Sequence, residues 1–131
     1  MILVDTSVWI DYLRDKDTAV VVRVAEFVDD GVDLLTTEPV VMELLMGADK
    51  PVEAAVVEQL TNGLPVLSVE PRVDYRSAAD IYQAARRNGL TVRSSVDCLI
   101  AAVAIRNDVP LLHKDADYDV IAEIAPLRTH K

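Results

Sequence analysis

The sequence predicts an α/β protein, a three-layer α/β/α sandwich whose central sheet is mainly parallel. Short apolar runs alternate along the chain with longer segments of helical periodicity, which is typical of strands linked by crossover helices. The runs at 2–4, 34–35 and 111–112 are apolar at every position, as expected for strands covered on both faces. The 131 residues fit a single domain, residues 1–131, and the 51% of apolar residues is enough for its core.

Capping residues, glycines and prolines set the expected element boundaries in the first half of the chain. Residues 2–4 form a buried strand, and Asp5, Thr6 and Ser7 then offer three consecutive helix-capping residues. The helix that follows is expected to run to Leu13. The remaining elements expected in this half are a helix capped by Asp17 and Thr18 and ended by Gly31, a strand at 34–35, a helix closed at Gly47, a helix from Pro51 to Leu60, and a strand at 66–69.

The second half begins with a long amphipathic helix from Pro71, which Asn88 and Gly89 end. Ser94 is expected to cap the most apolar helix, which covers residues 97–105. The spacing Ser94-x-x-Asp97 has the form of a capping box. The last expected elements are a strand at 111–112, a short helix around 120–124, and an edge strand at 127–129.

Acidic residues follow the predicted strands at the positions where a parallel sheet binds its ligands. Asp5 follows the first strand, and Asp115, Asp117 and Asp119 follow the strand at 111–112. Ligands of such sheets sit at the carboxyl ends of the strands, where the strand order reverses. Each of these residues, like Asp97, could instead serve only as a helix cap, so both interpretations stay open.

Glu43 does not fit a simple structural role. Its neighbours Val40 to Met46 are otherwise apolar, which predicts a buried helix. A buried ionised carboxylate costs several kcal/mol unless a charge or a metal compensates it. The best candidate partners, Asp5, Asp97 and Asp115, are themselves acids and would repel it. A hard divalent cation such as Mg²⁺ or Mn²⁺ resolves this conflict, and it predicts metal-dependent phosphodiester chemistry.

The overall charge appears at first to exclude a nucleic acid ligand. Thirteen basic and 22 acidic residues give a net charge of −9, whereas nucleic-acid-binding surfaces are usually basic. The charge is uneven, however, because residues 72–106 hold six arginines and only three acids. This stretch is expected to meet an RNA backbone, while a metal site would absorb part of the negative charge.

Cysteine content and hydropathy define the expected compartment. One cysteine, Cys98, permits no internal disulfide, and two histidines are too few for a common zinc site. The longest apolar run, residues 98–105, is too short to span a bilayer. We therefore expect a cytoplasmic protein without a membrane segment.

Four motifs, in order along the chain, resemble those of the PIN domain and in particular the VapC-type toxins of bacterial VapBC toxin–antitoxin pairs. The resemblance covers essentially the whole chain, and the ordered set is specific although each motif alone is weak. The motifs are Asp5-Thr6-Ser7-x-Trp9-Ile10, Glu43 in an apolar helix, Arg93-Ser94-x-x-Asp97-Cys98-Leu99-Ile100-Ala101-Ala102, and His113-Lys114-Asp115-x-Asp117-Tyr118.

The resemblance implies a PIN-like α/β/α fold and a Mg²⁺-dependent endoribonuclease, with Mn²⁺ as a possible substitute. It makes Asp5, Glu43, Asp97 and Asp115 an acidic tetrad, with Asp117 as a further metal-binding acid. Thr6 or Ser7 matches the hydroxyl beside the first acid. Arg93 matches a basic residue beside the third acid; it either clamps the scissile phosphate or forms a salt bridge to Asp97. His113 and Cys98 are expected to be structural.

The same resemblance implies protein partners. A cognate VapB-type antitoxin is expected to inhibit the enzyme, and a homodimer is expected as well. The apolar stretches Val20 to Val28 and Val40 to Met46 exceed the needs of one small core, so they are candidate contact surfaces. Two other functions remain open: a DNA-directed or flap-type metal nuclease, and a non-catalytic binding module on the same scaffold.

Overall fold

A four-stranded parallel sheet forms the centre of the fold. The computed structural model describes all residues, 1–131. The strands β1 (Ile2–Val4), β2 (Leu34–Leu35), β3 (Leu111–Leu112) and β4 (Thr129–His130) lie in the order β2-β1-β3-β4. All three pairings are parallel. This confirms the predicted α/β fold, and it places β1 and β3 side by side at the middle of the sheet.

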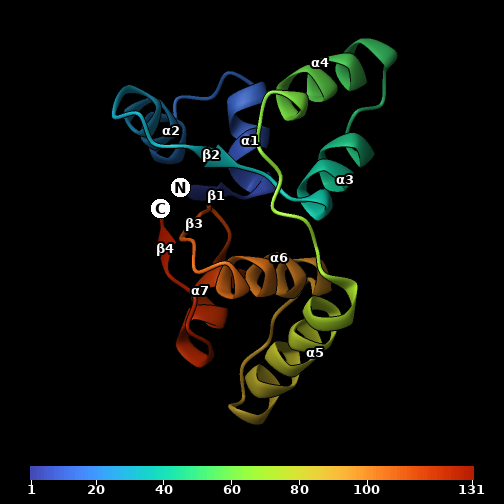
Figure 1. Cartoon of the computed structure of the whole chain (residues 1–131), viewed down its shortest axis with the longest axis vertical. Coiled ribbons are helices and arrows are strands. Elements are labelled where there is room, and N and C mark those ends of the chain that lie inside the picture. Colours follow the sequence, from blue (N-terminus) through green and yellow to red (C-terminus); the bar gives the residue numbers. More distant parts are fainter.

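Seven helices flank the sheet, as Figure 1 shows. In that view α1 and α4 lie above the strands and α5 and α7 lie below them, while α3 and α6 lie to their right. The apolar helix α6 contributes most to the core, since eight of its twelve residues are buried. No helix combines the length and apolar character that crossing a bilayer requires. The helices are α1 (Thr6–Leu13), α2 (Ala19–Asp29), α3 (Glu38–Met46), α4 (Pro51–Asn62), α5 (Pro71–Arg87), α6 (Ser95–Arg106) and α7 (Ala116–Ile124).

The strand predicted at 66–69 is absent. Only Val66 forms an isolated bridge, to Thr36, and the Leu67 N–H donates to the Thr36 carbonyl at 2.8 Å. Beyond that point the backbone leaves the sheet, because the Glu38 side chain takes the Val69 N–H at 2.8 Å. The segment is an extended connection between α4 and α5 rather than a sheet strand.

Thr18 and Ser94 lie at the predicted N-cap positions of α2 and α6, but neither side chain makes the capping bond. The Ser94 side chain makes no capping bond, so the capping box with Asp97 does not form. The Ser94 N–H is instead bound by Asp117 of α7, at 3.0 Å. Thr18 lies at the N-cap of α2, but its hydroxyl donates to the buried Asp11 at 3.0 Å. In both places a tertiary hydrogen bond has replaced a local one.

Helix α3 is not buried as predicted. Val40 and Leu44 face the core, whereas Met42, Leu45 and Met46 are 47%, 36% and 74% exposed. A hollow of about 600 Å³ lies along this exposed apolar face and continues to Val66. Helix α3 is therefore apolar both on the face that packs against the core and on the opposite face. The opposite face has no partner within this chain.

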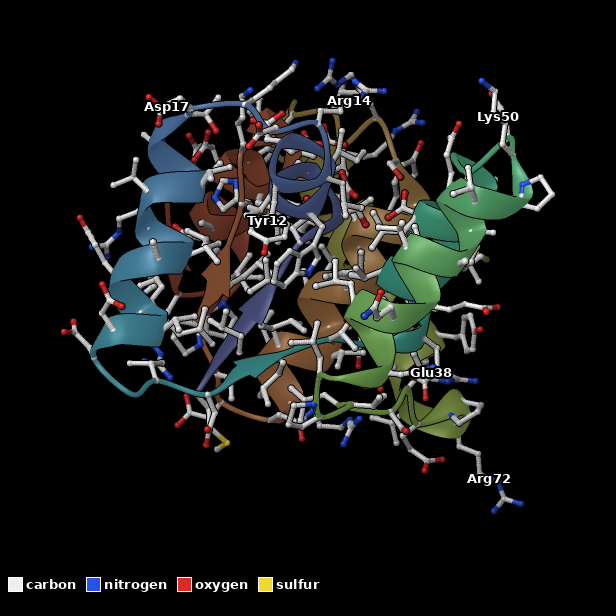
Figure 2. The ribbon with its side chains drawn as sticks, turned by 90° about the horizontal axis from the view of Figure 1, so that it is seen from above. Tyr12, Arg14, Asp17, Glu38, Lys50 and Arg72 are labelled. Carbon is white, nitrogen blue, oxygen red and sulfur yellow. The ribbon has the colours of Figure 1, made fainter.

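One of the six arginines expected to meet RNA has a structural role instead. Arg106 donates to both carboxylate oxygens of Asp74, at 2.8 and 2.9 Å, and to the Ser68 carbonyl. Asp74 is fully buried, and the Arg106 guanidinium helps to hold the pKa of Asp74 below its usual range against the effect of burial. Arg72, by contrast, points outward from the start of α5 (Figure 2). The pair fastens the 64–70 connection to α5 and α6.

Candidate metal centre

The predicted site residues lie where the strand order reverses. The chain passes from β1 to β2 on one side of β1 and then crosses to β3 on the other side, so the carboxyl ends of β1 and β3 border a crevice. Asp5 follows β1 and Asp115 closely follows β3. Asp97 reaches the same place from the first turn of α6. The sheet topology thus brings together acids that are far apart in the sequence.

The sequence left open whether Asp5 caps a helix or belongs to the site, and the structure allows both roles. It is the N-cap of α1, and its Oδ2 accepts the Ser7 N–H at 3.0 Å and the Ser7 hydroxyl at 2.5 Å. Its Oδ1 accepts the Tyr118 hydroxyl at 2.6 Å. Because a carboxylate oxygen has two lone pairs, Oδ2 is saturated and Oδ1 keeps one lone pair.

Asp97 is the acid with the least support from hydrogen bonds. It is 5% exposed, and its Oδ2 is buried without any hydrogen-bond partner. Its Oδ1 receives only a 3.2 Å contact from Tyr118. Burial, followed by the charge of Asp5, raises the pKa of Asp97 to about 8. A buried carboxylate oxygen without a donor is what a cation site requires.

Asp115 and Asp117 belong to the start of α7. Asp115 is its N-cap and accepts the Asp117 N–H at 2.9 Å through Oδ1. Asp117 accepts the N–H groups of Arg93 and Ser94, at 3.2 and 3.0 Å. Burial acts to raise the pKa of Asp117, but these bonds outweigh it and hold the pKa below the usual range. Ligand oxygens of Asp97, Asp115 and Asp117 all lie within 4.8 Å of one another.

Glu43 reaches the site from α3 but stands apart from the three grouped aspartates. It is half-buried, and its Oε1 accepts the Thr6 hydroxyl at 2.7 Å. Burial raises the pKa of Glu43, and the charges of Asp5 and Asp115 add to this effect against the Thr6 bond. Its predicted need for a partner is therefore met in part by Thr6, which leaves Oε2 free.

Arg93 does not pair with Asp97, which was one of its two predicted roles. Its Nε lies 3.3 Å from Asp117 Oδ1, and its terminal nitrogen lies 3.5 Å from Asp115 Oδ1. The side chain is 72% exposed, and these contacts raise its pKa. Arg93 thus borders the acidic group and keeps part of its guanidinium open to solvent.

Sequence reasoning missed the polar groups that hold the acids in place. Tyr118 was quoted only as part of a motif, although its hydroxyl contacts both Asp5 and Asp97. Lys114 was given no role, yet its N–H donates to the Ser7 hydroxyl and its ammonium to Asp11. His113 is buried as expected, and its Nδ1 accepts the Asp115 N–H at 3.2 Å. The one sequence signal for a role of Tyr118 in the site was its position directly after Asp117.

The chemistry of this donor set fits a hard divalent cation. All the candidate ligands are carboxylate oxygens, the type that Mg²⁺ and Mn²⁺ prefer. The buried Oδ2 of Asp97 has no donor within the protein. Asp97, Asp115 and Asp117 form the group that would hold such a cation, and Asp5 adjoins it through the Tyr118 hydroxyl that it shares with Asp97.

Comparisons with known sequences identify the family of this chain. A sequence model described as the PIN domain matches residues 2–124. The chain is 46% identical over 129 residues to the VapC ribonuclease Mb1587 of Mycobacterium bovis and to Ribonuclease VapC11 of Mycobacterium tuberculosis. Each of these matches covers 98% of this chain and 96% of the relative.

Solved structures share the same fold at lower sequence identity. The crystal structure of VapBC2 from Rickettsia felis, bound to a DNA fragment from its promoter, matches with a TM-score of 0.80 and 16% identity, over 99% of this chain and 98% of the other. VapBC-1 from nontypeable Haemophilus influenzae matches with a TM-score of 0.79 and 20% identity, over 100% and 98%.

Proposed function

Since this chain belongs to the PIN-domain family, in the group of the VapC proteins, we propose that it is a metal-dependent endoribonuclease and the toxin of a VapBC toxin–antitoxin pair. One observation carries the proposal: carboxylate oxygens of Asp97, Asp115 and Asp117 lie within 4.8 Å of one another, and a buried oxygen of Asp97 has no donor. The relatives at 46% identity are named ribonucleases.

The residues around the site have distinct roles in the proposed hydrolysis. A bound Mg²⁺ or Mn²⁺ supplies Lewis-acid polarisation of the phosphate and lowers the pKa of water. Glu43, with its raised pKa and free Oε2, is suited to hold a proton taken from the attacking water. Arg93 can turn its exposed guanidinium to a phosphate oxygen of the RNA, since a planar fork suits that geometry.

The exposed arginines of α5 are proposed to guide the RNA backbone. Arg86 and Arg87 lie in the last turn of α5, before the 88–93 loop that leads to Arg93. Phosphate contacts of this kind fix position and make binding dependent on salt. The proposed substrate is tRNA or another structured RNA. Because such RNA is found in the cytoplasm, the protein is proposed to act there.

Cleavage of RNA in the presence of Mg²⁺ tests the proposal. The wild-type protein should cut structured RNA, and EDTA should stop the reaction. Asp97→Asn should abolish cleavage while the circular dichroism spectrum stays unchanged, whereas the exposed Asp49→Asn should cut as the wild type does. Cleavage by Asp97→Asn at the wild-type rate would refute the assignment.

Two further assays separate the other candidate functions. Matched RNA and DNA of one sequence distinguish a ribonuclease from a DNA-directed or flap-type nuclease, and only the RNA should be cut. Calorimetry with Mn²⁺ distinguishes an enzyme from a binding module on the same scaffold. Absence of Mn²⁺ binding would favour the binding module.

The exposed apolar face of α3 is proposed to contact a protein partner. Met42, Leu45 and Met46 line it, and the chain is proposed both to dimerise and to bind a VapB-type antitoxin. The solution mass of the protein alone should be that of a dimer at micromolar concentration, and a monomer would refute this part of the proposal. Met46→Glu, at a 74% exposed position, then shows which contact the face serves: loss of the dimer assigns it to the second copy, and loss of the antitoxin complex alone assigns it to the antitoxin.

A further inference from the structure

A buried tyrosine connects two of the candidate metal ligands. Tyr118 lies in α7 and is fully buried, with its ring 5.1 Å from the ring of His113. Its hydroxyl lies 2.6 Å from Asp5 Oδ1 and 3.2 Å from Asp97 Oδ1. These two acids belong to different parts of the chain, at the start of α1 and in the first turn of α6. The hydroxyl is the one side-chain donor that they share.

We propose that Tyr118 is a positioning residue of the metal centre, whose hydroxyl bridges Asp5 and Asp97 and determines which of their oxygens remain free for the cation. This inference rests on the metal centre in the proposed function, but it does not depend on RNA being the substrate.

A count of lone pairs supports this role for Asp5. Ser7 uses both lone pairs of Asp5 Oδ2, so only Oδ1 remains available to a cation. Tyr118 takes one lone pair of that oxygen at 2.6 Å and leaves the other. Ser7 and Tyr118 together therefore restrict Asp5 to a single coordination position.

The same count separates the two oxygens of Asp97. Tyr118 contacts Oδ1, whereas the buried Oδ2 has no donor. A half-turn of the carboxylate only exchanges its two equivalent oxygens. The phenol therefore holds one oxygen of Asp97 at any time and leaves the other free for a cation.

Electrostatics gives the bridge a second effect. No lysine or arginine forms an ion pair with Asp5 or Asp97 within 4.0 Å. Both carboxylates are buried, so solvent screens their mutual repulsion only weakly. The phenol oxygen lies 2.6 Å from Asp5 and 3.2 Å from Asp97, and the dipole of its hydroxyl offsets part of this repulsion. Outer groups that orient ligands in this way typically change metal affinity by about 10- to 100-fold when they are removed.

Tyr118→Phe removes the hydroxyl and keeps the ring against His113. Calorimetry with Mn²⁺ should give an affinity about 10- to 100-fold weaker than that of the wild type. Tyr12→Phe is the matched control, because Tyr12 is 46% exposed and lies seven residues after Asp5 on α1 (Figure 2). This control should bind Mn²⁺ as the wild type does. An affinity of Tyr118→Phe within twofold of the wild type would overturn the proposal.

A double variant tests whether Tyr118 acts through its two acids. If it does, Tyr118→Phe should weaken Mn²⁺ binding much less in an Asp97→Asn background than in the wild type. Equal losses in both backgrounds would mean that Tyr118 acts on the fold in general, and would overturn the proposal. In cleavage assays the Mg²⁺ concentration for half-maximal rate should rise about 10-fold or more, while the KM for RNA stays unchanged.

A measurement on the wild-type protein covers the case in which Tyr118→Phe does not fold. Tyr118 is the one fully buried tyrosine, so a Mg²⁺ titration should change the tyrosine band in the near-ultraviolet circular dichroism spectrum. An unchanged band at saturating Mg²⁺ would overturn the proposal. A wild-type protein that binds Mn²⁺ but does not cut RNA would refute only the proposed function, since the Mn²⁺ comparison with Tyr118→Phe is independent of cleavage.

Discussion

The metal-free protein should lose stability as the pH rises, and Asp97 should be the main cause. The pKa of Asp97 is raised from 3.8 to about 8, first by burial and then by the charge of Asp5. The folded state therefore keeps this carboxyl protonated at pH values where the unfolded chain has released the proton. The stability that results is complete below the unfolded pKa and is lost as the pH rises through about 8.

The size of the effect follows from the shift. Each pKa unit corresponds to about 1.4 kcal/mol, so a shift of roughly four units sets an upper limit of about 6 kcal/mol. The part of this loss that falls between pH 5.5 and about 8 is roughly 2.5 units, or about 3 kcal/mol. With an unfolding entropy of about 2 cal/mol/K per residue, this corresponds to roughly 12 °C in Tm.

Thermal unfolding in excess EDTA at pH 5.5, 7 and 8.5 measures the effect. The Tm of the wild type should fall across this series by several degrees more than the Tm of Asp97→Asn, which should exceed it at pH 8.5. The exposed Asp49→Asn should follow the wild type. Added Mg²⁺ should remove most of the loss in the wild type, because the cation binds only the folded state. Parallel pH dependences for the wild type and Asp97→Asn would refute the reasoning.

Three other predictions concern single side chains. Arg106→Met leaves Asp74 buried and unpaired and should destabilise the fold by about 3–5 kcal/mol in urea; the exposed Arg72→Met should change stability by less than about 0.5 kcal/mol. Arg93→Ala should lower kcat/KM for RNA roughly 10-fold while Mn²⁺ affinity stays unchanged, and a joint loss of both would mean that this arginine only organises the acids. Glu43→Gln should lower kcat about 100-fold. Burial raises the pKa of Glu43, so the wild-type rate should fall as the pH drops below this raised pKa and the carboxylate becomes protonated. The variant should lack this acidic limb of the pH–rate profile.

The strands, the helices and the positions of the acids could be predicted from the sequence because they depend on local patterns. The strand 2–4 and the helix boundaries at Gly47 and Gly89 follow from apolar runs and stop signals within a few residues. The strand predicted at 66–69 is wrong because the Glu38 side chain, about thirty residues away, takes a backbone N–H there. No local pattern contains that contact.

The geometry of the candidate site shows the same limit. The sequence predicted that Asp5, Glu43, Asp97 and Asp115 act together, but it misjudged Glu43, whose helix is exposed on one face. It also missed Tyr118, because a tyrosine after an acidic pair carries no sign that its hydroxyl reaches β1 and α6. Contacts of this kind depend on the packing of α7 against the sheet.

The pairing of β1 with β3 sets an order of events during synthesis of the chain. Leu3 lies against Leu111, so β1 is synthesised long before its partner β3. Asp115 follows β3 by a few residues, whereas Asp5 is synthesised directly after β1. A nascent chain that lacks β3 therefore holds scattered acids and no assembled candidate site. Contacts between such distant segments also form slowly, and these acids come together only after β3 and α7 have joined the sheet.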